Sequence, residues 1–407
     1  MTDGRESSRL GDFSKDMLKT RAPSRWLMAG ILAVFALAAI LLQSTLWTSS
    51  LATLLGLAGV VLLQSNRWRS ASLLVAALAL AIGLLDVFAG WLAPSPHGAG
   101  MVWRTNPKNW LEADPNLGFR PIPNNVVVVT ATFDDKLVYR VTYTIGPDGT
   151  RVTPVAPSDA DLYVFMGDSF VFGQGLEDDQ TLPAQFARSN DLKVRTVNYS
   201  APGWGPNQLV RAFEIGALDR FAGEKVKAVV TWIIPDHLAR ITGDAGWLGA
   251  SPRYVLKAGK LEFTGSSTHH RWVNPLAGLR YLAGNIFTFV NAIGMQQRQT
   301  EQAELFGALM VRLQALAKEK FDAPLVVIYS WPDEHSGLAY GDSPETQARL
   351  VSLLRGLRKQ GITLLAVDQL TERMDASLLL IPHDGHPTAL VSLLVAAELK
   401  RRLKPLD

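Results

Sequence analysis

Residues 164–175 read VFMGDSFVFGQG, and this stretch shows how one expected strand ends. A run of apolar residues stops at Gly167 and is followed at once by Asp168 and Ser169. Glycine, aspartate and serine are common in ordinary turns, so the stretch taken alone has a purely structural explanation. The alternative is a nucleophilic serine presented at the carboxyl end of a buried strand.

Apolar strands and amphipathic helices are expected to alternate over residues 161–407. The expected strands are 162–166, 194–197, 228–234, 325–330 and 363–367, and the expected helices are 181–190, 208–218, 302–320, 344–360 and 387–403. Several of these strands are almost continuously apolar, which is typical of a parallel sheet covered on both faces. We therefore predict an α/β fold, a three-layer αβα sandwich whose ligands bind beyond the carboxyl ends of the strands.

The composition excludes several kinds of site. The 407 residues include no cysteine, so disulfides, thiolate metal sites and a cysteine nucleophile are excluded. The net charge is only +3 and no nucleic-acid motif is found, so no nucleic-acid partner is expected. The adjacent His269 and His270 have no second cluster at ligand spacing, so we expect no metal, and we expect no cofactor.

The N-terminal quarter of the chain is strongly apolar. The mean hydropathy is +0.11, and no charged residue occurs between Trp26 and Asn66. Stretches of about 20 apolar residues are long enough to cross a bilayer as helices. We predict three transmembrane helices in region 26–93, at residues 26–43, 46–64 and 70–93. The lipid bilayer is therefore an expected partner, and the chain is expected to be a multi-pass protein of the cytoplasmic (inner) membrane.

The basic residues predict the orientation of these helices. Tail 1–25 carries six of them before the first expected span, and Arg67 and Arg69 lie in the second connection. By the positive-inside rule the tail is cytoplasmic, and everything after residue 93 lies on the periplasmic or extracellular side. Region 94–160 is expected to be a linker followed by a β-hairpin of strands 126–133 and 137–145. An insert at 240–300, with a second expected hairpin, is interpreted as a lid or a partner surface.

A serine hydroxyl becomes an effective nucleophile only when a base accepts its proton. His386 is the best candidate, because it precedes a helix that must pack on the sheet, and Asp384 lies two residues before it. The structural alternative is that HDGH, residues 383–386, is a solvated turn at the start of the last helix. Backbone N–H groups of Ser169 and Gly203 could bind an oxyanion, although Gly203 could also belong to a plain turn.

Three motifs in this order resemble the SGNH (GDSL-like) hydrolase superfamily, of the membrane-anchored bacterial type. They are GDSF at 167–170, NYSAPGWGPNQ at 198–208 and DGHP at 384–387. The resemblance implies that Ser169 is the nucleophile, that Gly203 helps to form the oxyanion hole, and that His386 is the base assisted by Asp384. It covers about residues 161–405.

Two departures from the family pattern leave alternatives open. The family spacing is Asp-x-x-His, but Asp384 lies only two residues before His386, so a Ser-His dyad is an alternative to a triad. The family's third motif normally supplies an oxyanion-binding asparagine, but this chain has Asp236 and His237 after a proline. His237 or Asn198 could replace that donor, and Asp236 and His237 could equally be structural.

The sequence therefore predicts a membrane-anchored serine esterase acting on acyl, especially acetyl, esters of envelope or extracellular carbohydrate. One alternative is an O-acyltransferase for envelope polysaccharide, which would need a partner membrane protein, and another is a non-catalytic envelope scaffold. Four tryptophans near the expected site could stack on sugar rings or belong to the core, namely Trp204, Trp232, Trp247 and Trp331. His335 could line the pocket or be a solvated loop residue.

Overall fold

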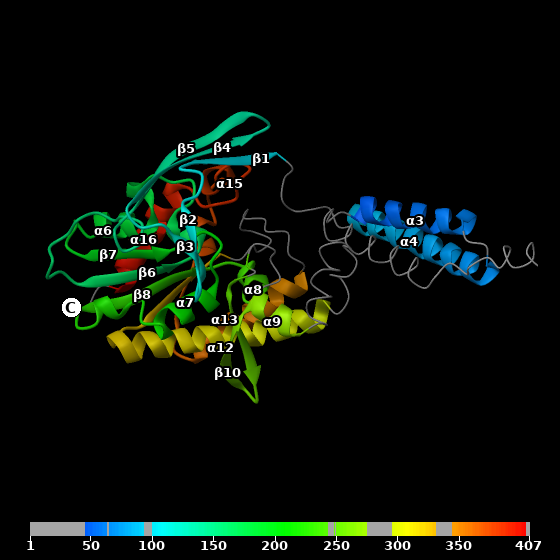
Figure 1. The fold of residues 1–407 in the computed structure, drawn as a ribbon. Coiled ribbons are helices and arrows are strands. Elements are labelled where there is room, and N and C mark those ends of the chain that lie inside the picture. The colour runs from blue at the N-terminus through cyan, green and yellow to red at the C-terminus, as the bar shows by residue number, and fades with distance from the viewer. Residues whose placement is uncertain are drawn as a thin grey trace, which may run out of the picture. The chain divides into compact units, whose positions relative to one another are not determined.

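The computed structural model describes residues 45–62, 65–92, 100–242, 248, 250–274, 295–330 and 344–403. The chain forms two compact units (Figure 1). One comprises residues 1–95 with 276–295, and the other comprises residues 96–275 with 296–407. All the candidate site residues belong to the second unit.

Two apolar helices make up the described part of the first unit, α3 (Thr45–Leu62) and α4 (Asn66–Leu92). They approach closely at Gly56, where an added Cβ would lie 2.8 Å from the Cβ of Ala76. Among the described residues, one helical stretch, Asn66–Leu84, is long and apolar enough to cross a membrane. The expected span 26–43 lies outside the described residues, and membrane insertion stays a prediction.

The second unit contains the expected parallel sheet. Its strands are β6 (Leu162–Gly167), β7 (Arg195–Ser200), β8 (Val226–Ile233), β11 (Leu325–Tyr329) and β12 (Thr363–Ala366). They lie in the order β12-β11-β8-β6-β7, and every neighbouring pair is parallel. Among these five strands β6 comes first in the chain, and it lies between β7 and β8 in the sheet. The chain therefore continues from β6 to β7 on one side and then crosses back over β6 to β8 on the other side. In open α/β sheets, ligands bind beyond the carboxyl ends of the strands at this switch point.

Helices cover both faces of the sheet, as expected. The helices of this unit are α5 (Ser169–Phe172), α6 (Leu182–Ser189), α7 (Pro206–Glu214), α8 (His237–Arg240), α9 (Ser267–Val273), α12 (Met295–Phe321), α13 (Pro344–Lys359), α14 (Asp368–Thr371), α15 (Ala376–Leu379) and α16 (Ala389–Leu403). Side chains of β6 alternate between two cores. Val164 and Met166 pack with α7, α12 and α13, whereas Tyr163 and Phe165 pack with α6 and α16. The predicted three-layer sandwich is confirmed.

Helix α12 begins seven residues before its expected range of 302–320. Helix α7 also differs from its expected range of 208–218. It begins at Pro206 and ends at Glu214. Proline favours the first turn of a helix, because its backbone lacks the N–H that would be unpaired there. The following Gly216 has a φ of +75°, a conformation that ends a right-handed helix.

A small β extension precedes the main sheet. The expected hairpin is confirmed as β4 (Asn125–Phe133) paired with β5 (Lys136–Ile145), and β1 (Met101–Asn106) adds a third antiparallel strand beside β4 (Figure 1). Two short strands, β2 (Leu111–Asp114) and β3 (Gly118–Pro121), pair separately. Buried side chains of β4 and β5 share one core with Phe172 of α5 and with Ile381. The extension therefore packs directly on segments adjacent to the candidate site.

The hairpin expected within the insert is also present, as β9 (Pro252–Lys257) paired with β10 (Lys260–Ser266). Tyr254 lies opposite Phe263 in this pair. Residues 243–247, 249 and 275–294 of the insert lie outside the described residues.

Candidate active site

Ser169 lies at a sharp turn between β6 and α5. Gly167 ends the strand, and a Cβ added there would lie 2.6 Å from Cγ2 of Val171, so only glycine allows this close approach. Asp168 caps α5, because its Oδ1 accepts a hydrogen bond from the backbone N–H of Phe170 at 2.9 Å. Ser169 is the first helical residue, and the turn holds it at the carboxyl end of β6.

The structure brings Ser169, His386 and Asp384 together. Nε2 of His386 lies 2.7 Å from Oγ of Ser169, although the two residues are 217 positions apart. Nδ1 of the same ring is hydrogen-bonded to Oδ1 of Asp384. The short Asp-x-His spacing therefore still delivers a carboxylate to the imidazole, and the three groups have the connectivity of a triad. An imidazole placed in this way can accept the serine proton and share the resulting charge with the carboxylate.

The other carboxylate oxygen of Asp384 contacts the β extension. The hydroxyl of Tyr139, on β5, donates to Oδ2 at 2.7 Å, and Nε1 of Trp103, on β1, lies 3.4 Å from the same atom. Burial alone would raise the pKa of Asp384, but hydrogen bonds from His386, Tyr139 and Trp103 outweigh burial and hold the pKa below its usual range. The carboxylate is therefore kept ionised while its side chain is fully buried.

A second buried network surrounds Asp168, the residue before Ser169. Oδ2 of Asp168 lies 3.1 Å from Nε2 of His237 and accepts from Nη1 of Arg240 at 2.8 Å. Nδ1 of His237 accepts from the backbone N–H of Ile234, so the ring proton is on Nε2 and points at Asp168. Burial raises the pKa of Asp168, but His237 and Arg240 outweigh it and lower that pKa to about 2. Burial lowers the pKa of His237, which favours the neutral ring.

Two hydrogen bonds hold the loop that contains Gly203. The N–H of Ala201 donates to the carbonyl of Gly167 at 3.2 Å, and Arg240 donates to the carbonyl of Trp204 at 3.0 Å. Gly203 has a φ of +90°, which glycine adopts without steric cost. The same arginine therefore fixes both Asp168 and this loop. Binding of an oxyanion by the backbone N–H groups of Gly203 and Ser169 stays a prediction.

The two side chains considered as replacements for the missing asparagine are engaged elsewhere. The amide of Asn198 donates to the carbonyls of Val171 and Phe172, and its oxygen accepts from Ser200. Both ring nitrogens of His237 are used in the network described above. Neither side chain has a donor left for an oxyanion, so that part of the sequence interpretation is wrong. Asp236 is half-exposed and lies 3.6 Å from Arg240, which is the structural alternative.

A fully buried arginine, Arg151, bonds the end of α5, the helix that begins at Ser169. Arg151 uses all its donors: Nε bonds Asp178, Nη1 bonds the carbonyls of Phe172 and Gly173, and Nη2 bonds two further carbonyls. Those two carbonyls belong to Thr142 of β5 and to Leu176. Arg151 therefore connects the end of α5 to the β extension.

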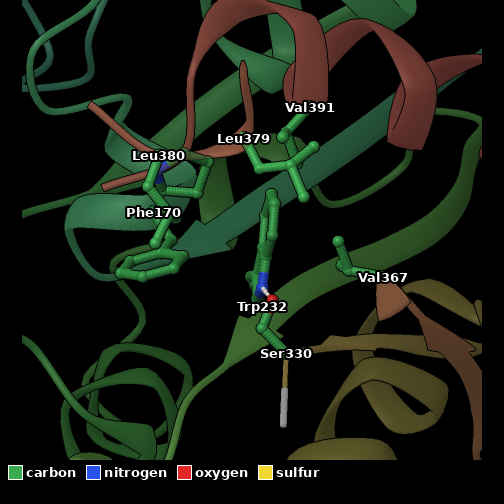
Figure 2. A pocket seen from close by; sticks show the side chains of 8 residues that line it. Phe170, Trp232, Ser330, Val367, Leu379, Leu380 and Val391 are labelled. Carbon is green, nitrogen blue, oxygen red and sulfur yellow. Dashed lines mark hydrogen bonds between the residues drawn. The ribbon is translucent and has the colours of Figure 1, made fainter. Parts of the chain in front are cut away.

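Two of the four tryptophans considered for sugar stacking are core residues. Trp204 and Trp232 are at most 2% exposed, and the sequence could not distinguish this from a surface position. Trp247, Trp331 and His335 lie outside the described residues. Figure 2 shows Trp232 in a small apolar pocket, with its Nε1 donating to Oγ of Ser330 at 2.9 Å. Phe170 and Pro387, the chain neighbours of Ser169 and His386, line the same pocket.

The described residues contain no group of three or more histidine and acidic side chains arranged to hold a metal ion. His269 lies in the first turn of α9, where its backbone N–H donates to Oγ of the capping Ser266.

The chain was compared with known proteins. No protein-family profile matches it, and no curated protein matches it in sequence. Solved structures similar to it include a G-D-S-L family lipolytic protein from Veillonella parvula DSM 2008. The two sequences are 11% identical, the match covers 61% of this chain and 100% of that chain, and the TM-score is 0.35. A lipase/acylhydrolase from Enterococcus faecalis has 15% identity, coverages of 61% and 99%, and a TM-score of 0.32. An acetyl xylan esterase from Geobacillus stearothermophilus has 10% identity, coverages of 61% and 96%, and a TM-score of 0.33.

The fold and the site agree with the resemblance drawn from the sequence. The parallel sheet and the hydrogen-bonded Ser169, His386 and Asp384 form the arrangement that the resemblance to SGNH (GDSL-like) hydrolases implied. The site also includes residues that the sequence analysis did not identify, namely Tyr139, Trp103, Arg151 and Arg240. No local signal marks them, because each acts through a partner brought close only by the fold.

Proposed function

We propose that the protein is a serine esterase that removes acyl groups, especially acetyl, from envelope or extracellular carbohydrate. The observation that carries the esterase chemistry is the 2.7 Å contact between Oγ of Ser169 and Nε2 of His386, with Asp384 on the opposite ring nitrogen. A non-catalytic scaffold has no need of this connectivity.

The reaction would proceed in two stages, acylation of Ser169 and hydrolysis of the acyl-enzyme. Oγ of Ser169 attacks the ester carbonyl while its proton moves to Nε2 of His386, and the negative oxygen is held by the N–H groups of Ser169 and Gly203. The carbon–oxygen bond to the alcohol then breaks, and His386 returns the proton to the departing oxygen. Water next attacks the acyl-enzyme and loses a proton to His386. The bond between the acyl carbon and Oγ then breaks, His386 returns the proton to Oγ, and the carboxylic acid leaves as Ser169 is regenerated.

The carbohydrate part of the proposal is supported by the surroundings of the site. Trp103 is half-exposed while its Nε1 lies beside the buried Asp384, so its ring borders the site from the solvent side. An aromatic ring offers a flat apolar face with a polar edge, which suits the apolar face of a sugar ring. The positive-inside orientation would place the site outside the cytoplasm, where envelope polysaccharide is found.

The function is tested with the full chain in detergent micelles and an acetylated oligosaccharide. We expect release of free acetate that is lost in Ser169→Ala. Acetate appearing on an added acceptor oligosaccharide, and not in solution, would instead identify the O-acyltransferase. Equal background release by both proteins would contradict any catalytic role of Ser169.

Membrane topology is tested separately with reporter fusions. A reporter after residue 66 is expected to be cytoplasmic, and one after residue 100 is expected to lie outside the cytoplasm. A cytoplasmic signal at residue 100 would contradict the proposed location of the site.

A further inference from the structure

The catalytic carboxylate has a second set of partners that the three motifs do not supply. Oδ1 of Asp384 is hydrogen-bonded to His386, while Oδ2 accepts from the hydroxyl of Tyr139 at 2.7 Å. Nε1 of Trp103 lies 3.1 Å from that hydroxyl and 3.4 Å from Oδ2, so it supports both. Tyr139 and Trp103 come from β5 and β1, about 245 and 281 positions before Asp384.

We propose that Tyr139 is the positioning residue of Asp384, and that the β extension is for this reason part of the catalytic centre. The inference rests on the proposed function, because it concerns the same serine, histidine and aspartate. Tyr139 touches no reacting atom; it acts through Asp384 on the orientation of His386.

The short Asp-x-His spacing explains why such a residue is needed. Asp384 and His386 lie on one tight loop, closed by the N–H of Ile381 donating to the carbonyl of His386 at 2.8 Å. Both neighbours of Asp384 have positive φ, +63° at His383 and +80° at Gly385. A carboxylate on such a loop, bonded through one oxygen only, can rotate about its side-chain torsions. A second hydrogen bond, on the other oxygen, removes that freedom.

The extension is held firmly enough to perform this task. Arg151 joins the carbonyl of Thr142, three residues after Tyr139, to the end of the serine helix α5. The N–H of Thr142 also donates to the carboxylate of Glu177 at 3.0 Å. On the other side, the ring of His383 stacks on that of Phe133 in β4, with centroids 3.8 Å apart. The extension is thus fastened to both the serine segment and the histidine loop.

The charges favour the same assignment. Burial and the negative charge of Asp384 raise the pKa of Tyr139, so its phenol remains a neutral donor over the working pH range. Hydrogen bonds from His386 and Tyr139 keep the pKa of Asp384 low despite burial. The phenol therefore stabilises the ionised carboxylate that the imidazole needs.

The test compares Tyr139→Phe with a matched control, Tyr254→Phe, in the full chain. Tyr254 also donates to a carboxylate, Glu214 at 2.6 Å, and no hydrogen bond found among the described residues joins this pair to Ser169, Asp384 or His386. Loss of a hydrogen bond to a charged group corresponds to about a tenfold to hundredfold effect. We expect Tyr139→Phe to lower kcat on p-nitrophenyl acetate, and the rate of fluorophosphonate labelling of Ser169, by about that factor, with KM little changed. The Tyr254→Phe protein should keep the wild-type values.

A double-mutant cycle distinguishes positioning from a general structural effect. If Tyr139 acts through Asp384, Tyr139→Phe should have no further effect on labelling in an Asp384→Asn background. The same factor in both backgrounds, or wild-type activity of Tyr139→Phe, would overturn the inference. Because labelling needs no natural substrate, the inference can survive if carbohydrate esters are not hydrolysed. Absence of any labelling of Ser169 in the wild type would overturn both the inference and the proposed function.

Discussion

Substitution of Arg151 tests most sharply how its hydrogen bonds stabilise α5, the helix that begins at Ser169. Its side chain is fully buried, and its donors are distributed as one bond from Nε, two from Nη1 and two from Nη2. In Arg151→Lys the charge remains, but an ammonium has only three donors on one atom, so at least two acceptors lose their partner. A buried acceptor left unpaired costs about 1–3 kcal/mol. We expect a loss of about 3 kcal/mol in the free energy of unfolding.

The assay is urea unfolding of the full chain in micelles, followed by tryptophan fluorescence. The matched control is Arg188→Lys, because Arg188 pairs with Asp179 where both side chains are more than half exposed. Exposed pairs contribute little, so this variant should stay within about 0.5 kcal/mol of the wild type. Equal midpoints for Arg151→Lys and the wild type would refute the reasoning that these bonds hold the turn in place.

Three further changes have defined outcomes. Gly167→Ala places a Cβ 2.6 Å from Cγ2 of Val171. We expect a lower melting temperature, corresponding to a loss of about 1–3 kcal/mol in the free energy of unfolding, and slower labelling of Ser169. An unchanged melting temperature and labelling rate would contradict the packing argument. Burial lowers the pKa of His237 in the folded protein. As the pH falls below about 6.5, His237 is therefore protonated in the unfolded chain before it is protonated in the folded protein, and the stability present above that pH is lost. His237→Gln should therefore flatten the fall in melting temperature between pH 7 and 5, and an unaltered slope would exclude His237 as its source. Arg240→Met should slow labelling of Ser169 by about tenfold or more, because Asp168 and the carbonyl of Trp204 lose a shared donor; wild-type labelling would show that the loop needs no such support.

Much of the fold could be predicted because its signals are local. Near-continuous apolar strands at 162–166 and 228–234 indicated a parallel sheet, and the polar residues after each strand indicated which edge carries the site. The alternating pattern at 137–145 predicted a hairpin. It gave no sign that the hydroxyl of Tyr139 would contact Asp384.

The remaining features depend on contacts between distant parts of the chain. The spacing of Asp384 and His386 left a dyad as an alternative, because sequence spacing does not fix the side-chain torsions that turn a carboxylate toward a ring. Asn198 was considered as a replacement for the missing oxyanion-binding asparagine of the third motif. The fold instead uses both its amide hydrogens on the carbonyls of Val171 and Phe172. Such competition for donors becomes visible only in three dimensions.

The central claim is that Ser169 is a nucleophile activated by His386, and covalent capture tests it most directly. The full chain is treated with a fluorophosphonate, and peptide mass mapping locates the adduct. We expect a single adduct on Ser169 that forms at least about a hundredfold more slowly in His386→Ala, since the hydroxyl then has no base to accept its proton. An adduct elsewhere, or equal rates in the two proteins, would contradict the account.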